Sequence, residues 1–170
     1  MTEPQAWAIL FLPLASFVII ALFIRPFLNQ RYSRLSGYVT IAAVGAAFIL
    51  SLSALKSTLG SNASIGWASH PWLTIGDLEI RVGILLDPLT AVMLVVVTGV
   101  SLLVQVYSQG YMKGDPGYSR YFAFMSLFTA SMLGVVLSSS ILQLYVFWEM
   151  VGLCSYLLIG FWYHRPAAAA

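Results

Sequence analysis

The sequence of 170 residues is 60% hydrophobic and only 8% charged, with a formal net charge of +2. Soluble domains contain about 25% charged residues, so this composition indicates a membrane protein and excludes a hydrophilic soluble enzyme. The small net charge does not indicate a nucleic-acid partner. The single cysteine can form neither an internal disulfide nor a cysteine-rich metal site.

Five apolar stretches are long enough to cross a membrane as helices, which requires about 20 residues for ~30 Å of hydrocarbon. They cover about residues 7–24, 37–55, 87–107, 121–137 and 141–163. The third opens with Asp87 and Pro88, a strong helix-start signal, because Asp caps free amide groups and Pro fits the first turn. The predicted fold class is an all-α membrane protein with about five transmembrane helices.

The loop between the second and third spans has the pattern of a β-hairpin. Apolar and polar residues alternate along the second half of LTIGDLEIRVGI, residues 73–84. Gly76 and Asp77 stand where a two-residue hairpin turn would fall. We therefore expect a small amphipathic hairpin that lies on the outer surface of the membrane.

The distribution of basic residues predicts the orientation of the spans. If five helices alternate in direction, six of the eight basic residues fall on one side. These six are Arg25, Arg31, Arg34, Lys113, Arg120 and Arg165, and the other side receives Lys56 and Arg81. Since basic loops stay on the cytoplasmic side, or on its equivalent in an organelle, the N-terminus and the hairpin are predicted to lie outside.

Glu149 is the ionisable acid within the fifth predicted span, about 12 Å from its outer end at 1.5 Å of rise per residue. Helical spacing places Tyr145, Gly152 and Tyr156 on the same face. An intramembrane carboxyl on a polar face is a candidate proton-binding group on a conduction path, with the two tyrosines as possible channel-lining residues. The alternative is a protonated glutamic acid that only bonds neighbouring helices together.

A cation that could balance Glu149 is absent from the predicted spans, since the lysines and arginines fall in loops or at span ends. The partner is therefore expected from another chain or from sequence beyond Ala170. Asp87 is either a helix cap or part of an outer proton exit or subunit contact. His164 could titrate at a cytoplasmic mouth, although an interfacial anchor is the simpler interpretation.

Three segments carry a resemblance to a known family: LLDPLTAVML from residue 85, GYMKGDPGYSRYFAFMSLFTASM from residue 110, and VFWEMVGLCSYLLIGFWY from residue 146. They resemble the large antiporter-like subunit of respiratory complex I, the NADH-quinone oxidoreductase. This subunit is called subunit L in bacteria, chain 5 in mitochondria and NdhF in plastids and cyanobacteria. Family members are much longer, so the resemblance covers only their N-terminal portion.

The resemblance implies that residues 1–84 form a two-helix segment with the outer loop, and that residues 85–170 begin an antiporter-like proton-translocation module. Glu149 matches the essential proton-binding glutamate of the family, whose partner lysine lies on a later helix. NADH, FMN, iron–sulfur clusters and quinone are expected in other subunits, with no cofactor or metal in this chain. The expected partners are the other membrane subunits and the lipid bilayer of a bacterial plasma membrane, a thylakoid or an inner mitochondrial membrane.

Two alternative functions follow from the same residues. The related large subunit of a multisubunit Na⁺/H⁺ antiporter, or of a membrane hydrogenase, shares the motif around Glu149. A membrane scaffold that transports nothing would differ from both, because replacement of Glu149 would then leave proton pumping in the intact complex unchanged.

Overall fold

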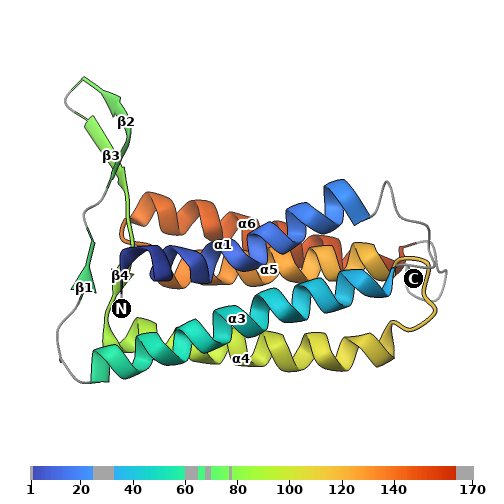
Figure 1. The fold of residues 1–170 in the computed structure, drawn as a ribbon. Coiled ribbons are helices and arrows are strands. Elements are labelled where there is room, and N and C mark those ends of the chain that lie inside the picture. Colours follow the sequence, from blue (N-terminus) through green and yellow to red (C-terminus); the bar gives the residue numbers. More distant parts are fainter. Residues whose placement is uncertain (1, 25–32, 60–64, 68–69, 77, 164–170) are drawn as a thin grey trace.

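The computed structural model describes residues 2–24, 33–59, 65–67, 70–76 and 78–163. Five helices of membrane-spanning length and apolarity lie side by side in these ranges (Figure 1). They are α1 (Glu3–Ile19, continued by the π-helix η1, Ile20–Ile24), α3 (Arg34–Leu59), α4 (Pro88–Tyr111), α5 (Tyr118–Leu137) and α6 (Ile141–Ile159, continued by the 3₁₀-helix η3, Gly160–Trp162). The number and order of the predicted spans are confirmed, and the chain is an integral membrane protein.

The helices extend further than the apolar stretches predicted. α3 begins three residues before and ends four residues after the predicted second span, and it includes Arg34 and Lys56. Near its end the hydroxyl of Thr58 donates to the carbonyl of Ala54 at 3.1 Å. α3 therefore continues past the point where the hydropathy falls. Polar side chains at the membrane boundary are compatible with a helix, so hydropathy alone does not give the helix ends.

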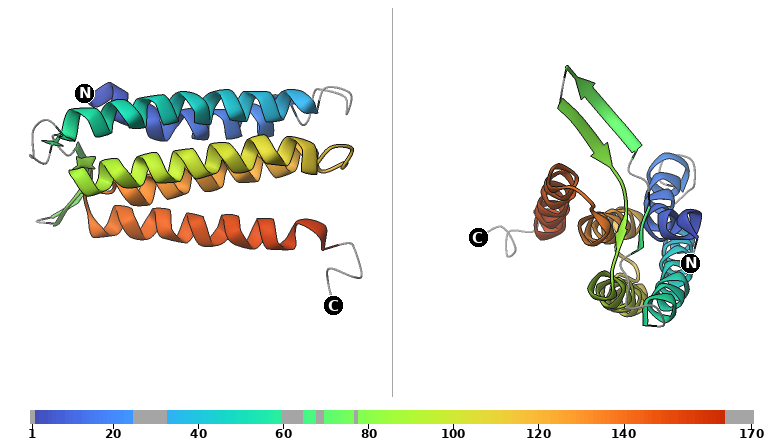
Figure 2. Two further views of the ribbon diagram at one scale, coloured as in Figure 1. Left: turned by 90° about the horizontal axis from the view of Figure 1, so that it is seen from below. Right: turned by 90° about the vertical axis from the view of Figure 1, so that its left-hand side faces the viewer.

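Consecutive helices run in opposite directions and pack around α5. Viewed along the bundle, α1, α3 and α4 lie on one side of α5, whereas α6 lies on the other (Figure 2). One apolar cluster fills the bundle near the hairpin and includes Ile9, Leu94 and Leu133. A second cluster at the opposite end includes Ile20 and Phe122. α6 therefore joins the bundle mainly through its contact with α5.

Buried hydroxyl groups join α1 to α5 at Pro13. The Pro13 carbonyl accepts hydrogen bonds from Ser16 at 2.8 Å and from Ser126 of α5 at 2.7 Å. The two serine hydroxyls also contact each other. Small polar side chains of this kind allow membrane helices to approach closely and satisfy groups that water cannot reach.

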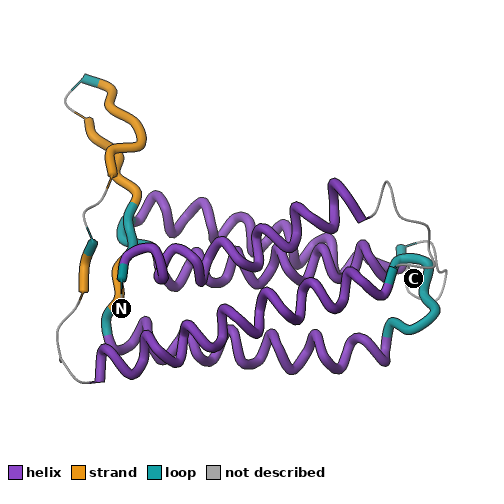
Figure 3. Tube along the Cα trace, in the orientation of Figure 1, coloured by secondary structure: helices purple, strands orange, loops and turns teal. Residues whose placement is uncertain are grey.

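The predicted hairpin is present at one end of the bundle. Strand β2 (His70–Ile75) pairs antiparallel with β3 (Leu78–Val82), and Ile75 faces Leu78 across a two-residue turn. Gly76 adopts a φ of 59°, which favours glycine in such turns. The strands run crosswise to the helix axes (Figure 3), as expected for a hairpin that lies along the membrane surface.

A second strand pair was not predicted. Strand β1 (Ile65–Gly66) pairs antiparallel with β4 (Leu85–Leu86), so that the outer loop closes on itself before α4 begins. The helix directions also place Arg34, Lys113 and Arg120 at the end of the bundle opposite the hairpin. The predicted orientation depends on these three residues lying on one side together with Arg25, Arg31 and Arg165, which lie outside the described residues.

Candidate functional site

The start of α6 is fixed by contacts with the outer loop. Ser140 caps the helix, its hydroxyl accepting a hydrogen bond from the Gln143 amide at 3.3 Å. The side-chain oxygen of Gln143 accepts a hydrogen bond from the Gly83 amide at 3.2 Å. Ile84 also forms an antiparallel bridge with Ser138. The first turn of α6 is thus tied to the segment that follows β3.

One side of α6 packs on α5. The ring of Phe147 lies directly on Gly134, and a Cβ atom built on this glycine would overlap the ring. About two turns further, Cys154 is fully buried and lies 4.0 Å from the Ser131 hydroxyl. Cys154 is therefore a packing residue of the α5–α6 contact.

The opposite side of α6 carries the predicted polar face. Glu149 and Gly152 are exposed, as are Tyr145 at 59% and Tyr156 at 73%. The four residues predicted by helical spacing to share a face do lie together, on the side away from Phe147. Only 11% of the most apolar window of this span is buried, against 50% for α5. Among the five candidate spans, the one that contains α6 has the smallest buried share.

The Glu149 carboxylate lies on that exposed face and forms no hydrogen bond or ion pair with any other described residue. The expectation of a buried carboxylate is therefore not met within this part of the protein. Within the described ranges no lysine or arginine forms an ion pair with this carboxylate. The exposed face would bury Glu149 only when another element covers it.

A polar cluster at the other end of α6 was missed by the sequence analysis. Arg120, at the start of α5, donates to the Phe161 carbonyl at 3.1 Å and lies 4.7 Å from the centre of its ring. The Trp162 indole donates to Asp115 at 3.1 Å, and the same carboxylate accepts from the Gly117 amide at 2.7 Å. The partner of Arg120 is thus a carbonyl and a ring, which no charge pattern could indicate.

Asp87 acts as the N-cap of α4. Its carboxylate accepts a hydrogen bond from the Thr90 amide at 2.6 Å. These hydrogen bonds from Thr90 lower the pKa of Asp87 below its ordinary value. The ionised form is therefore favoured, which suits a permanent cap better than a group that exchanges protons. His164 lies outside the described residues.

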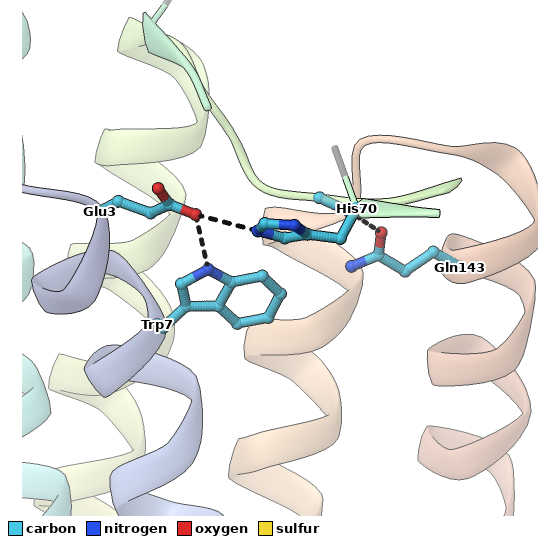
Figure 4. A network of polar contacts seen from close by, with 5 residues as sticks. Glu3, Trp7, His70 and Gln143 are labelled. Carbon is cyan, nitrogen blue, oxygen red and sulfur yellow. Dashed lines mark hydrogen bonds and ion pairs between the residues drawn. The ribbon is translucent and has the colours of Figure 1, made fainter. Parts of the chain in front are cut away.

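The hairpin is also tied to α1 through a contact that the sequence analysis did not anticipate. Glu3 accepts a hydrogen bond from the Trp7 indole at 3.4 Å, and the same carboxylate oxygen lies 3.6 Å from Nε2 of His70 (Figure 4). His70 is the first residue of β2, so this contact joins the hairpin to the first turn of α1. Among the described residues no group of three His, Cys, Asp or Glu side chains could hold a metal ion.

Comparisons with known proteins agree with this arrangement. The family model for the N-terminus of NADH-ubiquinone oxidoreductase (complex I) chain 5 matches residues 72–122. The model for the transmembrane region of NADH:quinone oxidoreductase and the Mrp antiporter matches residues 138–170, which include α6.

Curated relatives are similar over nearly the whole chain. A chloroplast NAD(P)H-quinone oxidoreductase subunit 5 from Mesostigma viride is 48% identical over 96% of this chain. NAD(P)H-quinone oxidoreductase chain 5 from Synechocystis sp. is 44% identical over the same share. The chain spans about a quarter of the length of these relatives, 25% and 24% respectively.

Two solved structures share the fold. An archaeal membrane-bound sulfane sulfur reductase matches with a TM-score of 0.77 over 96% of this chain and 31% of its own, at 17% identity. The Mrp complex from Dietzia sp. matches with a TM-score of 0.64 and 34% identity, over 88% of this chain and 16% of its own. The five-helix arrangement is thus common to several multisubunit membrane complexes.

Proposed function

Because the chain belongs to the chain 5 family of NADH-quinone oxidoreductases, we propose that it forms the N-terminal part of a proton-translocating membrane subunit of such a complex. Quinone is reduced elsewhere in the complex, and this subunit couples that reaction to proton transfer through Glu149. NADH, FMN, iron–sulfur clusters and quinone are bound by other subunits. The membrane is a bacterial plasma membrane, a thylakoid or an inner mitochondrial membrane, with the N-terminus outside.

The observation that carries this proposal is the position of Glu149 on the uncovered face of α6. Folding of the five spans does not use this carboxylate, since α6 packs on α5 through Phe147 and Cys154. A charged residue in the middle of a membrane span is costly unless it is paired, hydrated or neutralised, so its presence there indicates a functional role. Later helices of the longer protein would cover the face, exclude lipid and supply the balancing cation.

Proton transfer would follow from the charge near the carboxylate. A cation that approaches Glu149 stabilises the ionised form and favours release of the proton, whereas its withdrawal in apolar surroundings favours the protonated form. Tyr145 and Tyr156 are on the same face and can donate and accept hydrogen bonds along a path to the carboxylate. They are proposed channel-lining residues, together with His164 at the cytoplasmic mouth.

Asp87 is proposed to act differently from the other site residues. Its hydrogen bond with the Thr90 amide uses the carboxylate for capping. At the outer end of α4 the ionised side chain can still contribute negative charge at a proton exit. In that role it would attract protons electrostatically without carrying them.

The replacement Glu149→Gln tests the proposal in the intact complex. Glutamine keeps the size and hydrogen-bonding capacity of the side chain but cannot release a proton. We expect proton translocation through this subunit to fall about 100-fold, the lower range for loss of a positioned proton-transfer group. Proton uptake by reconstituted vesicles during quinone reduction is the measurement, and co-purification of the other subunits reports assembly.

The matched control is Glu79→Gln, which neutralises an exposed carboxylate of the hairpin paired with Arg81 at 2.9 Å. It should pump normally. Unchanged pumping by an assembled Glu149→Gln complex would contradict the proposal and favour the alternative of a membrane scaffold that transports nothing.

A second candidate function is that of a large subunit in a cation/proton antiporter. Two observations support this second candidate: the 34% identity to the Mrp complex and the family model shared with the Mrp antiporter over residues 138–170. Purification separates the two candidates, because a quinone oxidoreductase carries flavin and iron–sulfur absorbance with the complex. Exchange of Na⁺ for H⁺ without these chromophores would favour the antiporter.

A further inference from the structure

A polar cavity of about 420 Å³ opens at the end of the bundle that carries most of the basic residues. It lies between the first turn of α3, the end of α4 and the start of α5. Besides Gly110 and Gly114, the described residues of its lining are Ser33, Arg34, Tyr38, Gln109, Lys113 and Tyr118. Its volume falls within the range of small-ligand pockets, about 300–1,000 Å³.

Among the described residues, the lining brings together two cations and no carboxylate. Arg34 and Lys113 come from different helix ends and have no ion pair with another described residue. The nearby carboxylate of Asp115 is held by the Gly117 amide and the Trp162 indole. The start of α3 adds the positive end of the helix dipole. The cavity is therefore suited to an anion.

The inner wall of the cavity is built by close packing. Tyr118 is only 4% exposed, and its ring packs on Phe122 with 4.7 Å between the centroids. A Cβ atom on Gly37 would lie 2.5 Å from the Tyr118 hydroxyl and 3.4 Å from Nε2 of Gln109. The absence of a side chain at Gly37 thus allows both polar groups to sit against α3.

The depth of the cavity indicates where its ligand comes from. Arg34 begins one membrane-spanning helix, and Lys113 lies two residues after the end of another. Both cations are therefore at the level where lipid headgroups meet the hydrocarbon. Tyr38, which is 61% exposed, adds an aromatic ring with a polar tip typical of this interface.

We propose that this cavity binds the anionic headgroup of a membrane lipid, with Arg34 and Lys113 contacting its phosphate or sulfonate group. Basic pockets between membrane helices on the cytoplasmic side recognise such headgroups through charge and hydrogen bonds. The site is separate from Glu149, which lies on the middle of α6, and it does not depend on proton transfer there. A bound lipid would join α3 to the α4–α5 connection.

The experiment uses the intact complex in vesicles with a photoactivatable phosphatidylglycerol or, in parallel, a photoactivatable phosphatidylcholine. We expect the anionic probe to label peptides that contain residues 33–38 or 109–118, and the zwitterionic probe not to label them. Millimolar inorganic phosphate should not prevent the labelling, because the lipid is also held by its acyl chains. Equal labelling by both probes, no labelling of these peptides, or full competition by phosphate would each overturn the proposal.

Variants test the two cations directly. Arg34→Gln combined with Lys113→Gln should lower anionic labelling at these peptides at least about ten-fold, given the attraction of each basic residue for anionic lipid. The control, Lys56→Gln with Arg81→Gln, removes the same charge at the other end of the bundle and should label normally. An equal loss in both variants would contradict the assignment. If the first variant does not assemble, the labelling map of the unmodified complex decides.

Discussion

α5 and α6 are neighbouring helices of similar length, yet they use their surfaces in opposite ways. α5 contacts α1, α3, α4 and α6, and half of its most apolar window is buried. α6 contacts α5 along one side, and only 11% of the corresponding window is buried. The side of α6 that faces α5 holds Gln143, Phe147 and Cys154, whereas its other side holds a carboxylate and two phenols.

This difference separates residues that build the bundle from residues that serve another purpose. Substitutions on α5 and on the inner side of α6 should act on stability, because packing density there is high. Substitutions at Glu149, Tyr145 or Tyr156 should act on transport, because no described contact depends on them. The largest expected effect, the loss of proton translocation in Glu149→Gln, belongs to the second group.

The largest effect on stability is expected where the two helices touch. Gly134→Ala places a methyl group inside the ring of Phe147, and overpacking of this kind costs about 1–3 kcal/mol. The thermal unfolding midpoint of the purified complex should fall, and α6 should become more accessible to proteases. Gly45→Ala is the control, since its nearest neighbour, Leu102, would lie 3.9 Å away. Equal midpoints for the two variants would contradict a tight contact at Gly134.

A smaller loss is expected at the inner end of α6. Arg120→Gln removes the stacking on Phe161 and weakens the hydrogen bond to its carbonyl. Contacts of this kind contribute about 1–2 kcal/mol together. Arg120→Lys keeps the charge but not the planar group, so its stability should lie between that of Arg120→Gln and that of the unmodified protein. Hydrogen exchange in residues 159–163 is the measurement, and unchanged protection would show that Arg120 does not hold this end.

The caps of α4 and α6 give a third comparison, because one is a carboxylate and the other a hydroxyl. Asp87→Ala should cost about 1 kcal/mol, whereas Asp87→Asn should preserve the cap. The lowered pKa of Asp87 means that its contribution is present above the unfolded value near 3.9 and is lost as pH falls through the folded value. Ser140 caps α6 without such a dependence.

The measurement is the unfolding midpoint of Asp87→Ala and of Asp87→Asn across acidic pH. The difference between Asp87→Asn and the unmodified protein should be small at neutral pH and should disappear in strong acid. A constant difference at every pH would exclude the ionised cap.

The smallest effect is expected at the contact between Glu3 and His70, at the hairpin end of the bundle. Both side chains are partly exposed, at 35% and 71%, so His70→Gln should change stability by no more than about 0.5 kcal/mol. Because dissolved salt screens an exposed pair of this kind, the effect should weaken further in high salt. A loss as large as that of Gly134→Ala would mean that the hairpin, and not α5, organises the bundle.

Much of the fold could be predicted because membrane spans and tight turns leave local signals. Asp87 and Pro88 marked the start of α4, and Gly76 marked the hairpin turn. The pairing of β1 with β4 could not be predicted, since two-residue strands about twenty residues apart carry no periodic pattern. The extra turns of α3 were missed because hydropathy records the membrane boundary and not the end of backbone hydrogen bonding.

For the candidate site, the sequence predicted which residues share a face but not what surrounds them. Helical spacing was sufficient to group Tyr145, Glu149 and Tyr156. All three are exposed among the described residues, and helical spacing does not indicate which side of a helix a neighbouring element covers. Arg120 was missed for a related reason, because a carbonyl and an aromatic ring far along the chain carry no charge that a sequence can reveal.

The hydrogen bond from the Gly83 amide to Gln143 in the first turn of α6, and the bridge between Ile84 and Ser138 just before that helix, make the hairpin a reporter of α6. If α6 tilts or shifts when Glu149 changes its charge, the strands that precede these contacts are expected to move with it. A fluorophore in place of Trp72, which is 67% exposed and lines a small apolar pocket against α6, would then report that movement from the hairpin end of the bundle.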